Sequence, residues 1–172
     1  MRCGAGRSVK LNLGAGDFPL DGWLNVDLPE FDLCIFPWPW INGSVEAMNA
    51  SHVLEHFDLT TIRCALAECR RILQAGGWLT VAAPDLDVFV DARLNGDESA
   101  LNGYHWRDLN HLLGGDENEP RPEWRHRYMF SRASLWQELE WAGFVVADRE
   151  FDLALDNVNY RGFSVYLEGV RA

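Results

Sequence analysis

Two glycines and a downstream aspartate are the residues of this chain best placed to hold a ligand. Gly14 and Gly16 directly follow the apolar run Val9–Leu13, and Asp27 ends a second short run at 23–27. Glycine lets backbone N–H groups approach a ligand that a Cβ would keep away, and a carboxylate can accept hydrogen bonds from both hydroxyls of a ribose. A glycine turn followed by a strand-end acid is therefore typical of a parallel α/β sheet that binds a nucleoside.

The glycine turn does not fit a dinucleotide. The dinucleotide fingerprint requires a third glycine near position 19, and Pro19 stands there. An earlier glycine pair, Gly4 and Gly6, follows no strand and is not a second candidate. Phe18, beside the turn, is the best local candidate for packing against a bound cofactor.

His52, Glu55 and His56 form the pattern H-x-x-E-H, which also occurs in inverted zinc proteases. On a long helix the two histidines would share a face and could bind zinc. The pattern instead lies at a strand end, ahead of the helix-capping candidate Asp58. Spacing marks no third protein ligand, so no metal site is predicted. A zinc hydrolase stays a minor alternative that metal analysis of the purified protein would test.

A polar stretch at 96–127 lacks clear periodicity. Long irregular segments inside compact domains are usually functional, so we expect a lid or an acceptor-binding segment there. Histidine is commonly the base in catalysis near neutral pH, and polar groups at the carboxyl ends of strands face the ligand crevice of α/β proteins. The candidates for catalytic groups are His126, His105, His111, Tyr128 and Asp85.

Apolar strands alternate with amphipathic helices along the chain, which predicts an α/β three-layer sandwich with a Rossmann-like, mostly parallel sheet. The link after the first strand is too short for a full crossover helix, so that helix is expected to be reduced or absent. The last two strands are expected to form an antiparallel pair. Strands are expected at 9–13, 23–27, 31–35, 45–51, 78–83, 144–151 and 163–170, and helices at 58–74, 86–95 and 131–142.

Length and composition limit the classes of partner. The 172 residues fit a single domain, 1–172, in which residues 1–8 form a loose leader. A net charge of −11 disfavours nucleic acid as a substrate. The four cysteines form no C-x-x-C pair and are expected to be reduced. Neither a transmembrane run nor a signal peptide is recognised, so we expect no membrane partner and a cytoplasmic location; the oligomeric state stays open.

With these pieces placed, the chain resembles the class I S-adenosylmethionine (SAM)-dependent methyltransferases. We expect it to depart from them in lacking the first crossover helix and the family's usual N-terminal helix, for which there is no room before Val9; one side of the cofactor cleft would then be open unless 96–127 cover it. The matching segments, in the family's order, are LNLGAG at 11–16, NVD at 25–27, ASHVLEHF at 50–57, RILQAGGWLTVAAPD at 71–85 and, more weakly, HRYMF at 126–130 leading to EWAGF at 140–144.

The resemblance implies SAM as cofactor and transfer of its methyl group to a small-molecule acceptor. The acidic surface and the histidines favour an oxygen atom as the one methylated. The alternative is a methyltransferase-like protein that binds the cofactor in a regulatory or assembly role without turnover. The residues implied to bind SAM are Gly14, Ala15 and Gly16 at the methionine end, Asp27 at the ribose, Asp32 and Leu33 beside the adenine, and Ser51 and His52, which complete the site.

Overall fold

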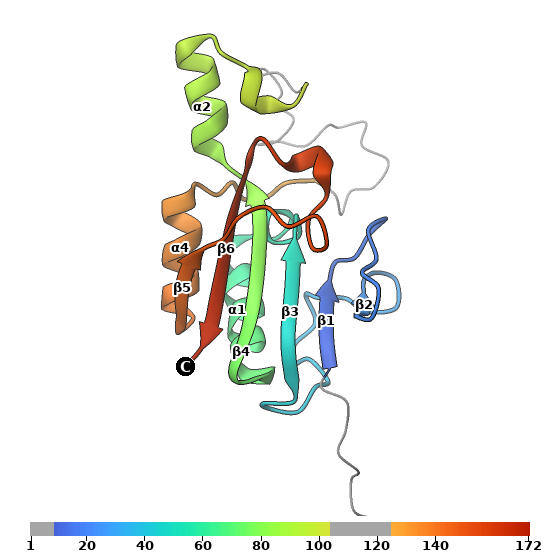
Figure 1. Cartoon of the computed structure of the whole chain (residues 1–172). Coiled ribbons are helices and arrows are strands. Elements are labelled where there is room, and N and C mark those ends of the chain that lie inside the picture. The colour runs from blue at the N-terminus through green and yellow to red at the C-terminus, as the bar shows by residue number, and fades with distance from the viewer. Residues whose placement is uncertain (1–8, 104–124) are drawn as a thin grey trace, which may run out of the picture.

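Six strands form one sheet in the order β2-β1-β3-β4-β6-β5 in the computed structural model, which describes residues 9–103 and 125–172 (Figure 1). Strands β1 to β4 are parallel to one another, and β6 runs antiparallel to both β4 and β5. The predicted mostly parallel sheet with its C-terminal antiparallel pair is therefore confirmed. The strands are β1 (Val9–Leu13), β2 (Leu24–Val26), β3 (Val45–Ser51), β4 (Leu73–Pro84), β5 (Phe144–Asp148) and β6 (Ser164–Arg171).

The link between β1 and β2 contains turns and no helix, so the absence of the first crossover helix is also confirmed. This link folds back at once, because the backbone amide of Phe18 donates to the carbonyl of Ala15 at 2.8 Å. The short return brings the ends of β1 and β2 side by side.

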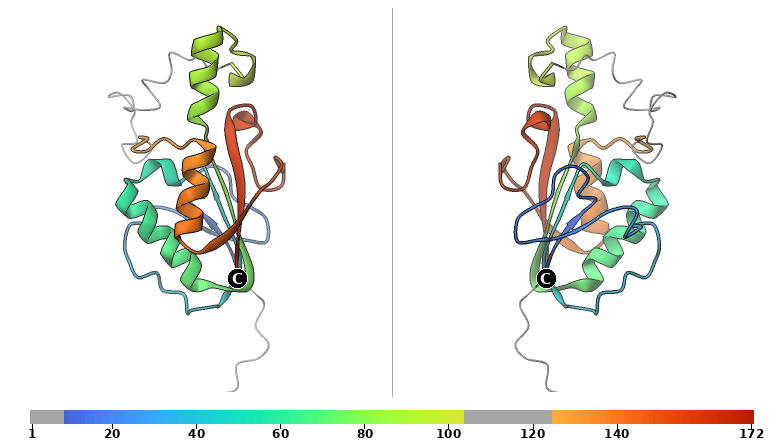
Figure 2. Two further views of the ribbon diagram at one scale, coloured as in Figure 1. Left: turned by 90° about the vertical axis from the view of Figure 1, so that its left-hand side faces the viewer. Right: turned by 90° about the vertical axis from the view of Figure 1, so that its right-hand side faces the viewer.

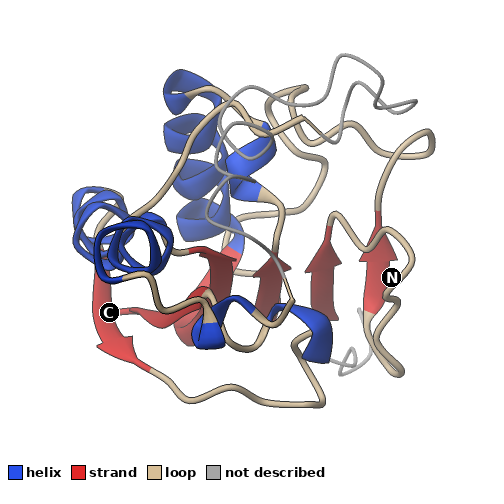
Figure 3. Cartoon of the chain, turned by 90° about the horizontal axis from the view of Figure 1, so that it is seen from above, coloured by secondary structure: helices blue, strands red, loops and turns tan. Residues whose placement is uncertain are grey.

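Two helices, α1 (Leu59–Ile72) and α4 (Arg132–Trp141), cover one face of the sheet (Figures 2 and 3). Asp58 caps α1 by accepting from the amide of Thr61, as its position before the apolar helix predicts. Ser131 caps α4 in the same way. The core between these helices and the sheet includes Leu11, Met48, Leu79, Leu167, Ile62, Leu66, Leu135 and Leu139.

The opposite face is covered by the connection between β5 and β6, residues 149–163 (Figure 3). The connection includes the short 3-10 helix η5 (Val158–Tyr160). Arg149 and Asp156 hold it together through two hydrogen bonds of 2.6 Å, and Asp156 is 1% exposed. The carbonyl of Leu155 accepts a hydrogen bond from Asn49 of β3, which ties this loop to the sheet. In the described part of the chain, a loop rather than helices thus forms this layer.

The strand expected at 31–35 is wrong: this stretch consists of turns. Leu33 is buried, but Ile35 is 67% exposed, so the alternate apolar residues of this stretch do not share one buried face. The Trp38 backbone amide instead donates to Glu68 of α1 at 2.6 Å, and Arg71 donates to the carbonyls of Trp38 and Trp40. The segment between β2 and β3 is therefore held against α1 by its backbone.

Beyond β4 the chain projects from the carboxyl end of the sheet as α2 (Leu86–Asn95), followed by the 3-10 helix η2 (Ser99–Leu101) (Figure 1). Phe89 of α2 packs against Phe163, which precedes β6. Most of the irregular segment predicted at 96–127 lies outside the described residues. Among the helices that are described, none is long and apolar enough to cross a membrane.

Candidate active site

A cavity of about 640 Å³ opens where β1, β2, β3 and β4 end. This volume lies within the range of small-molecule and cofactor sites, and the carboxyl edge of a parallel sheet is where α/β proteins bind ligands. The lining includes all eight residues predicted to bind a cofactor: Gly14, Ala15, Gly16, Asp27, Asp32, Leu33, Ser51 and His52.

The glycine turn has the backbone conformation that only glycine adopts easily. Gly14 and Gly16 have φ angles of 59° and 48°, in the left-handed region. A Cβ on Gly14 would lie 2.6 Å from Cγ2 of Val53, so the turn packs too closely against the segment after β3 for any side chain. The wall of the cavity at this point is therefore bare main chain.

Asp27 faces the glycine turn directly. Its Oδ2 accepts a hydrogen bond of 2.6 Å from the Gly16 amide, and its Oδ1 accepts one of 2.8 Å from the Leu28 amide. Each carboxylate oxygen can accept a further hydrogen bond. The acid is thus fixed in orientation and keeps acceptor capacity for a diol.

Asp32 and Leu33 lie further along the same wall. The Asp32 carboxylate accepts from the Cys34 amide at 2.8 Å, while Leu33 is 6% exposed and belongs to the core. Phe18, just after the glycine turn, also lines the cavity and is 36% exposed. Apolar side chains are therefore available beside the position predicted for an adenine.

Beneath the cavity, polar side chains hydrogen-bond across neighbouring strands. Asn25, Asn12, Asn49 and Thr80 are paired in register, and successive side chains are joined at 2.9, 2.9 and 2.8 Å. Asn12 and Asn49 are 3% and 1% exposed and both line the cavity. This row was not predicted from the sequence; its signal was a buried asparagine among the apolar residues of β1 and of β3.

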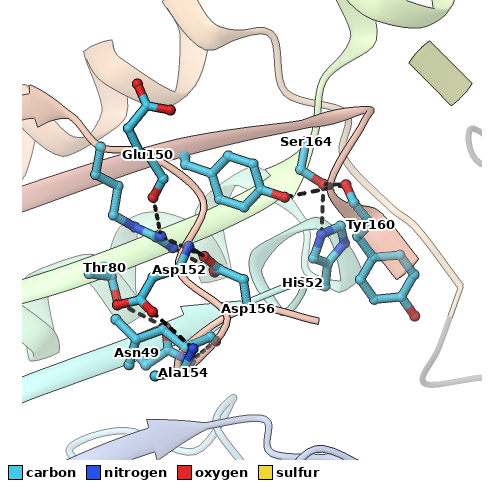
Figure 4. A network of polar contacts seen from close by, with 12 residues as sticks. Asn49, His52, Thr80, Glu150, Asp152, Ala154, Asp156, Tyr160 and Ser164 are labelled. Carbon is cyan, nitrogen blue, oxygen red and sulfur yellow. Dashed lines mark hydrogen bonds and ion pairs between the residues drawn. The ribbon is translucent and has the colours of Figure 1, made fainter. Parts of the chain in front are cut away.

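His52 has a left-handed backbone with φ of 56°, which is uncommon for a residue with a side chain. Its Nε2 lies 2.9 Å from Oγ of Ser164, and its ring stacks at 4.1 Å on Tyr160 (Figure 4). On the other side, Nδ1 lies 3.2 Å from Oε1 of Glu55. His52 therefore links the end of β3 to the β5–β6 connection, and strain of this kind is typical of functional sites.

Glu55 lies in the 3-10 helix η1 (Leu54–His56) and is completely buried. Burial raises the pKa of its carboxyl group, but the neighbouring His52, His56 and His126 outweigh burial and lower the pKa to about 2. The ring centres of His56 and His126 are 4.9 Å apart. The structure thus gathers three histidines around one buried carboxylate.

The predicted catalytic residues do not all meet at the cavity. His126 is part of its lining. Asp85 instead caps α2 by accepting from the Asp87 amide at 3.1 Å, and burial raises its pKa. Tyr128 packs against the main core and Phe130. His105 and His111 lie outside the described residues.

Asn157 and Tyr160 also line the cavity, although the sequence analysis did not select them. They come from the β5–β6 connection, which is distant in the sequence from the ends of β1, β2 and β3 but folds over the same sheet. No local motif marks such residues, because their place depends on the docking of the loop on the sheet, where the Leu155 carbonyl accepts from Asn49.

No family model and no curated protein matches the sequence. Solved structures do match the fold. A SAM-dependent methyltransferase from Thermotoga maritima, described as a possible histamine N-methyltransferase, superposes with a TM-score of 0.61 at 16% identity, over 97% of this chain and 84% of that one. The YcgJ protein from Bacillus subtilis gives 0.58 at 13% identity, over 95% and 92% of the two chains. PigF with SAH gives 0.60 at 16% identity, over 96% and 56%.

These likenesses define the class of the fold. The chain has the fold of the class I SAM-dependent methyltransferases, as its sequence motifs predicted. Its cavity occupies the edge of the sheet at which α/β proteins of this kind hold their ligands.

Proposed function

We propose that the chain is a SAM-dependent methyltransferase that acts on a small-molecule acceptor, with oxygen as the atom methylated. One observation carries the proposal: the glycine turn of β1 is hydrogen-bonded to Asp27 at the end of β2, on the wall of a cofactor-sized cavity. This is the pairing of bare backbone and carboxylate that a nucleoside with a charged tail requires. The fold of the chain agrees with this activity.

The cofactor would lie along the wall built by the ends of β1 and β2. Its methionine end would lie against Gly14–Gly16, its ribose at Asp27, and its adenine beside Asp32 and Leu33. Ser51 and His52 would complete the cofactor site, and the acceptor would enter from the side formed by His126 and Tyr160.

SAM supplies a methyl carbon that is already activated by its sulfonium, so the chain has little covalent chemistry to perform. Its residues must align the acceptor oxygen with that carbon and exclude water, and alignment alone can contribute about 7–11 kcal/mol. A hydroxyl acceptor must also lose a proton, and His126 at the acceptor end is our candidate for the group that assists.

Calorimetric titration with SAM and with its demethylated product tests the proposal. We expect both to bind the wild type, and Asp27→Ala to weaken binding by about 100-fold or more, because two hydrogen bonds to a charged group are lost. Asp21→Ala is the matched control, since Asp21 is an exposed turn residue of the same β1–β2 link. Equal affinity of all three proteins would overturn the ribose assignment.

Turnover separates the enzyme from the alternative of a cofactor-binding protein. Incubation with SAM and a panel of small hydroxylated acceptors should release the demethylated product. Tight SAM binding without release on any acceptor would favour the regulatory or assembly role.

A further inference from the structure

We propose that Glu55, His56 and His126 form a site for a divalent transition-metal ion at the acceptor end of the cavity. The inference rests on the proposed function, because it assigns the ion a place beside the methyl acceptor. It also alters the sequence prediction, in which the H-x-x-E-H pattern lacked a third ligand and no metal was expected.

The geometry of the cluster supports the site. A carboxylate oxygen of Glu55 and one ring nitrogen from each histidine all lie within 4.8 Å of one another. All three residues line the cavity. Ligands at about 2.0–2.2 Å from a Zn²⁺ ion lie roughly 3–3.5 Å apart, so small side-chain rotations would close the site. Two imidazoles and one carboxylate are the ligand set of catalytic zinc sites and of non-haem iron sites that keep open positions.

The state of Glu55 is independent evidence for a cation. Glu55 is 0% exposed; its Oε1 lies 3.2 Å from Nδ1 of His52, and its Oε2 has no hydrogen-bond partner among the described residues. Nδ1 of the neighbouring His56 is buried and likewise has no hydrogen-bond partner in the described part of the chain. A buried carboxylate is costly unless it is paired or coordinates a metal. A bound cation would satisfy both residues together.

The backbone explains why His126 lies beside a motif that is far away in the sequence. The carbonyl of Glu55 accepts hydrogen bonds from the amides of Arg127 and Tyr128, at 2.7 and 3.1 Å. These bonds hold the residues after His126 directly on η1, which carries Glu55 and His56. The three ligands are therefore positioned by main-chain contacts rather than by flexible loops alone.

His52 acts as a positioning residue for this site. Its Nε2 is held by Ser164 (Figure 4), and its Nδ1 lies 3.2 Å from Glu55 Oε1, so the ring is fixed from both sides. A histidine that orients a ligating carboxylate is a typical outer partner of a metal site.

A cation here would bind the acceptor oxygen and lower the pKa of its hydroxyl group. The hydroxyl proton would pass to solvent. The oxygen would donate an electron pair to the methyl carbon, and the carbon–sulfur bond would break with its electron pair returning to sulfur. His126 then serves as a metal ligand rather than as a free base, and the reaction releases one proton for each methyl group transferred.

Zn²⁺ titration of the untagged, chelator-treated protein tests the site by calorimetry, together with metal analysis by mass spectrometry. We expect one ion per chain with micromolar or tighter affinity. Glu55→Gln and His126→Ala should each lower the affinity by at least about 100-fold, since even outer partners of metal ligands are worth 10- to 100-fold. Asp97→Asn, a carboxylate-to-amide change at an exposed residue, should leave Zn²⁺ affinity unchanged.

Replacement of Zn²⁺ by Co²⁺ gives a second readout, because the visible absorption of Co²⁺ reports its coordination and should disappear in His126→Ala.

SAM titration of each variant distinguishes failure of the metal site from failure of the proposed function. SAM binding without Zn²⁺ binding would overturn the metal site but would not contradict the proposed methyltransferase function. Zn²⁺ binding that depends on Glu55 and His126, without any SAM binding, would support the metal site and contradict the proposed methyltransferase function. Zn²⁺ affinity that both variants retain would also overturn the site.

Discussion

At the residue scale, the cofactor proposal depends first on Gly14. Gly14→Ala should cost about 1–2 kcal/mol for the left-handed backbone and about 1–3 kcal/mol more for the clash with Val53. Gly22→Ala is the control, because Gly22 has φ of 79° but nothing within 4 Å of an added Cβ. Chemical unfolding should therefore show a larger loss for Gly14→Ala, and SAM affinity should fall only in that variant. Equal losses in both would mean that the close packing on Val53 is absent.

The residues of the glycine turn and Asp27 could be predicted from the sequence because their relation is local. They follow consecutive strands, so the parallel sheet brings them together. The contact of His126 with Glu55 and His56 could not be predicted, because two main-chain hydrogen bonds create it. Because backbone N–H and C=O groups do not depend on residue type, such bonds leave no pattern of side chains in the sequence.

At the element scale, Glu68 holds the segment between β2 and β3 on α1. It accepts from the Trp38 amide at 2.6 Å and from Arg71 at 2.7 Å. Glu68→Ala should lower the free energy of unfolding by about 1–3 kcal/mol, because charged hydrogen bonds are lost and a backbone N–H loses its partner. Glu140→Ala, at an exposed site on α4, should stay within about 0.5 kcal/mol. No difference between the variants in denaturant titrations would contradict this role.

The same contact predicts a pH dependence. The hydrogen bond from Arg71 lowers the pKa of Glu68 from its ordinary value of 4.5, although burial opposes the shift. A carboxyl group with a lowered folded-state pKa contributes stability above its unfolded pKa and loses it as the pH falls through the folded value. The stability difference between wild type and Glu68→Gln should thus be full at neutral pH and shrink below pH 4.5. A difference that stays constant down to pH 3 would refute the assignment.

The β5–β6 connection should depend on its buried ion pair. Asp156→Ala leaves Arg149, whose side chain is 11% exposed, without its partner, and breaking a buried pair in this way costs about 3–5 kcal/mol. Asp148→Ala breaks the exposed pair with Arg132 and should cost much less, because solvent screens it. Thermal unfolding of the two variants makes the comparison. Similar losses would show that the loop is held in another way.

Strands and helices with strong periodicity could be predicted, and the failure at 31–35 has a physical cause. Phe31, Leu33 and Ile35 alternate as in a strand, but this stretch does not pair with β2, the edge strand of the sheet. The hydrogen bonds of this stretch go to turns and to α1 instead. Alternation reports how side chains are spaced, whereas a strand also requires a partner.

For the whole molecule, the two faces of the sheet are covered by different means. Helices α1 and α4 lie on one face, and the β5–β6 connection lies on the other, where it also supplies Asn157 and Tyr160 to the cavity (Figure 2). The alternation of strands and helices predicted the sheet and its helices. It could not predict that a loop would cover the second face, because the ion pair that shapes this loop does not say where the loop docks, and the contact with the sheet joins Leu155 to Asn49 of the distant strand β3.

A crystal structure of the protein with the demethylated product of SAM is the most direct test of the account. We predict the nucleoside across the carboxyl edge of the sheet, with both ribose hydroxyls within hydrogen-bonding distance of Asp27 and the amino-acid tail against Gly14–Gly16. A cavity that stays empty at saturating ligand, or a nucleoside bound away from Asp27, would contradict the central claim.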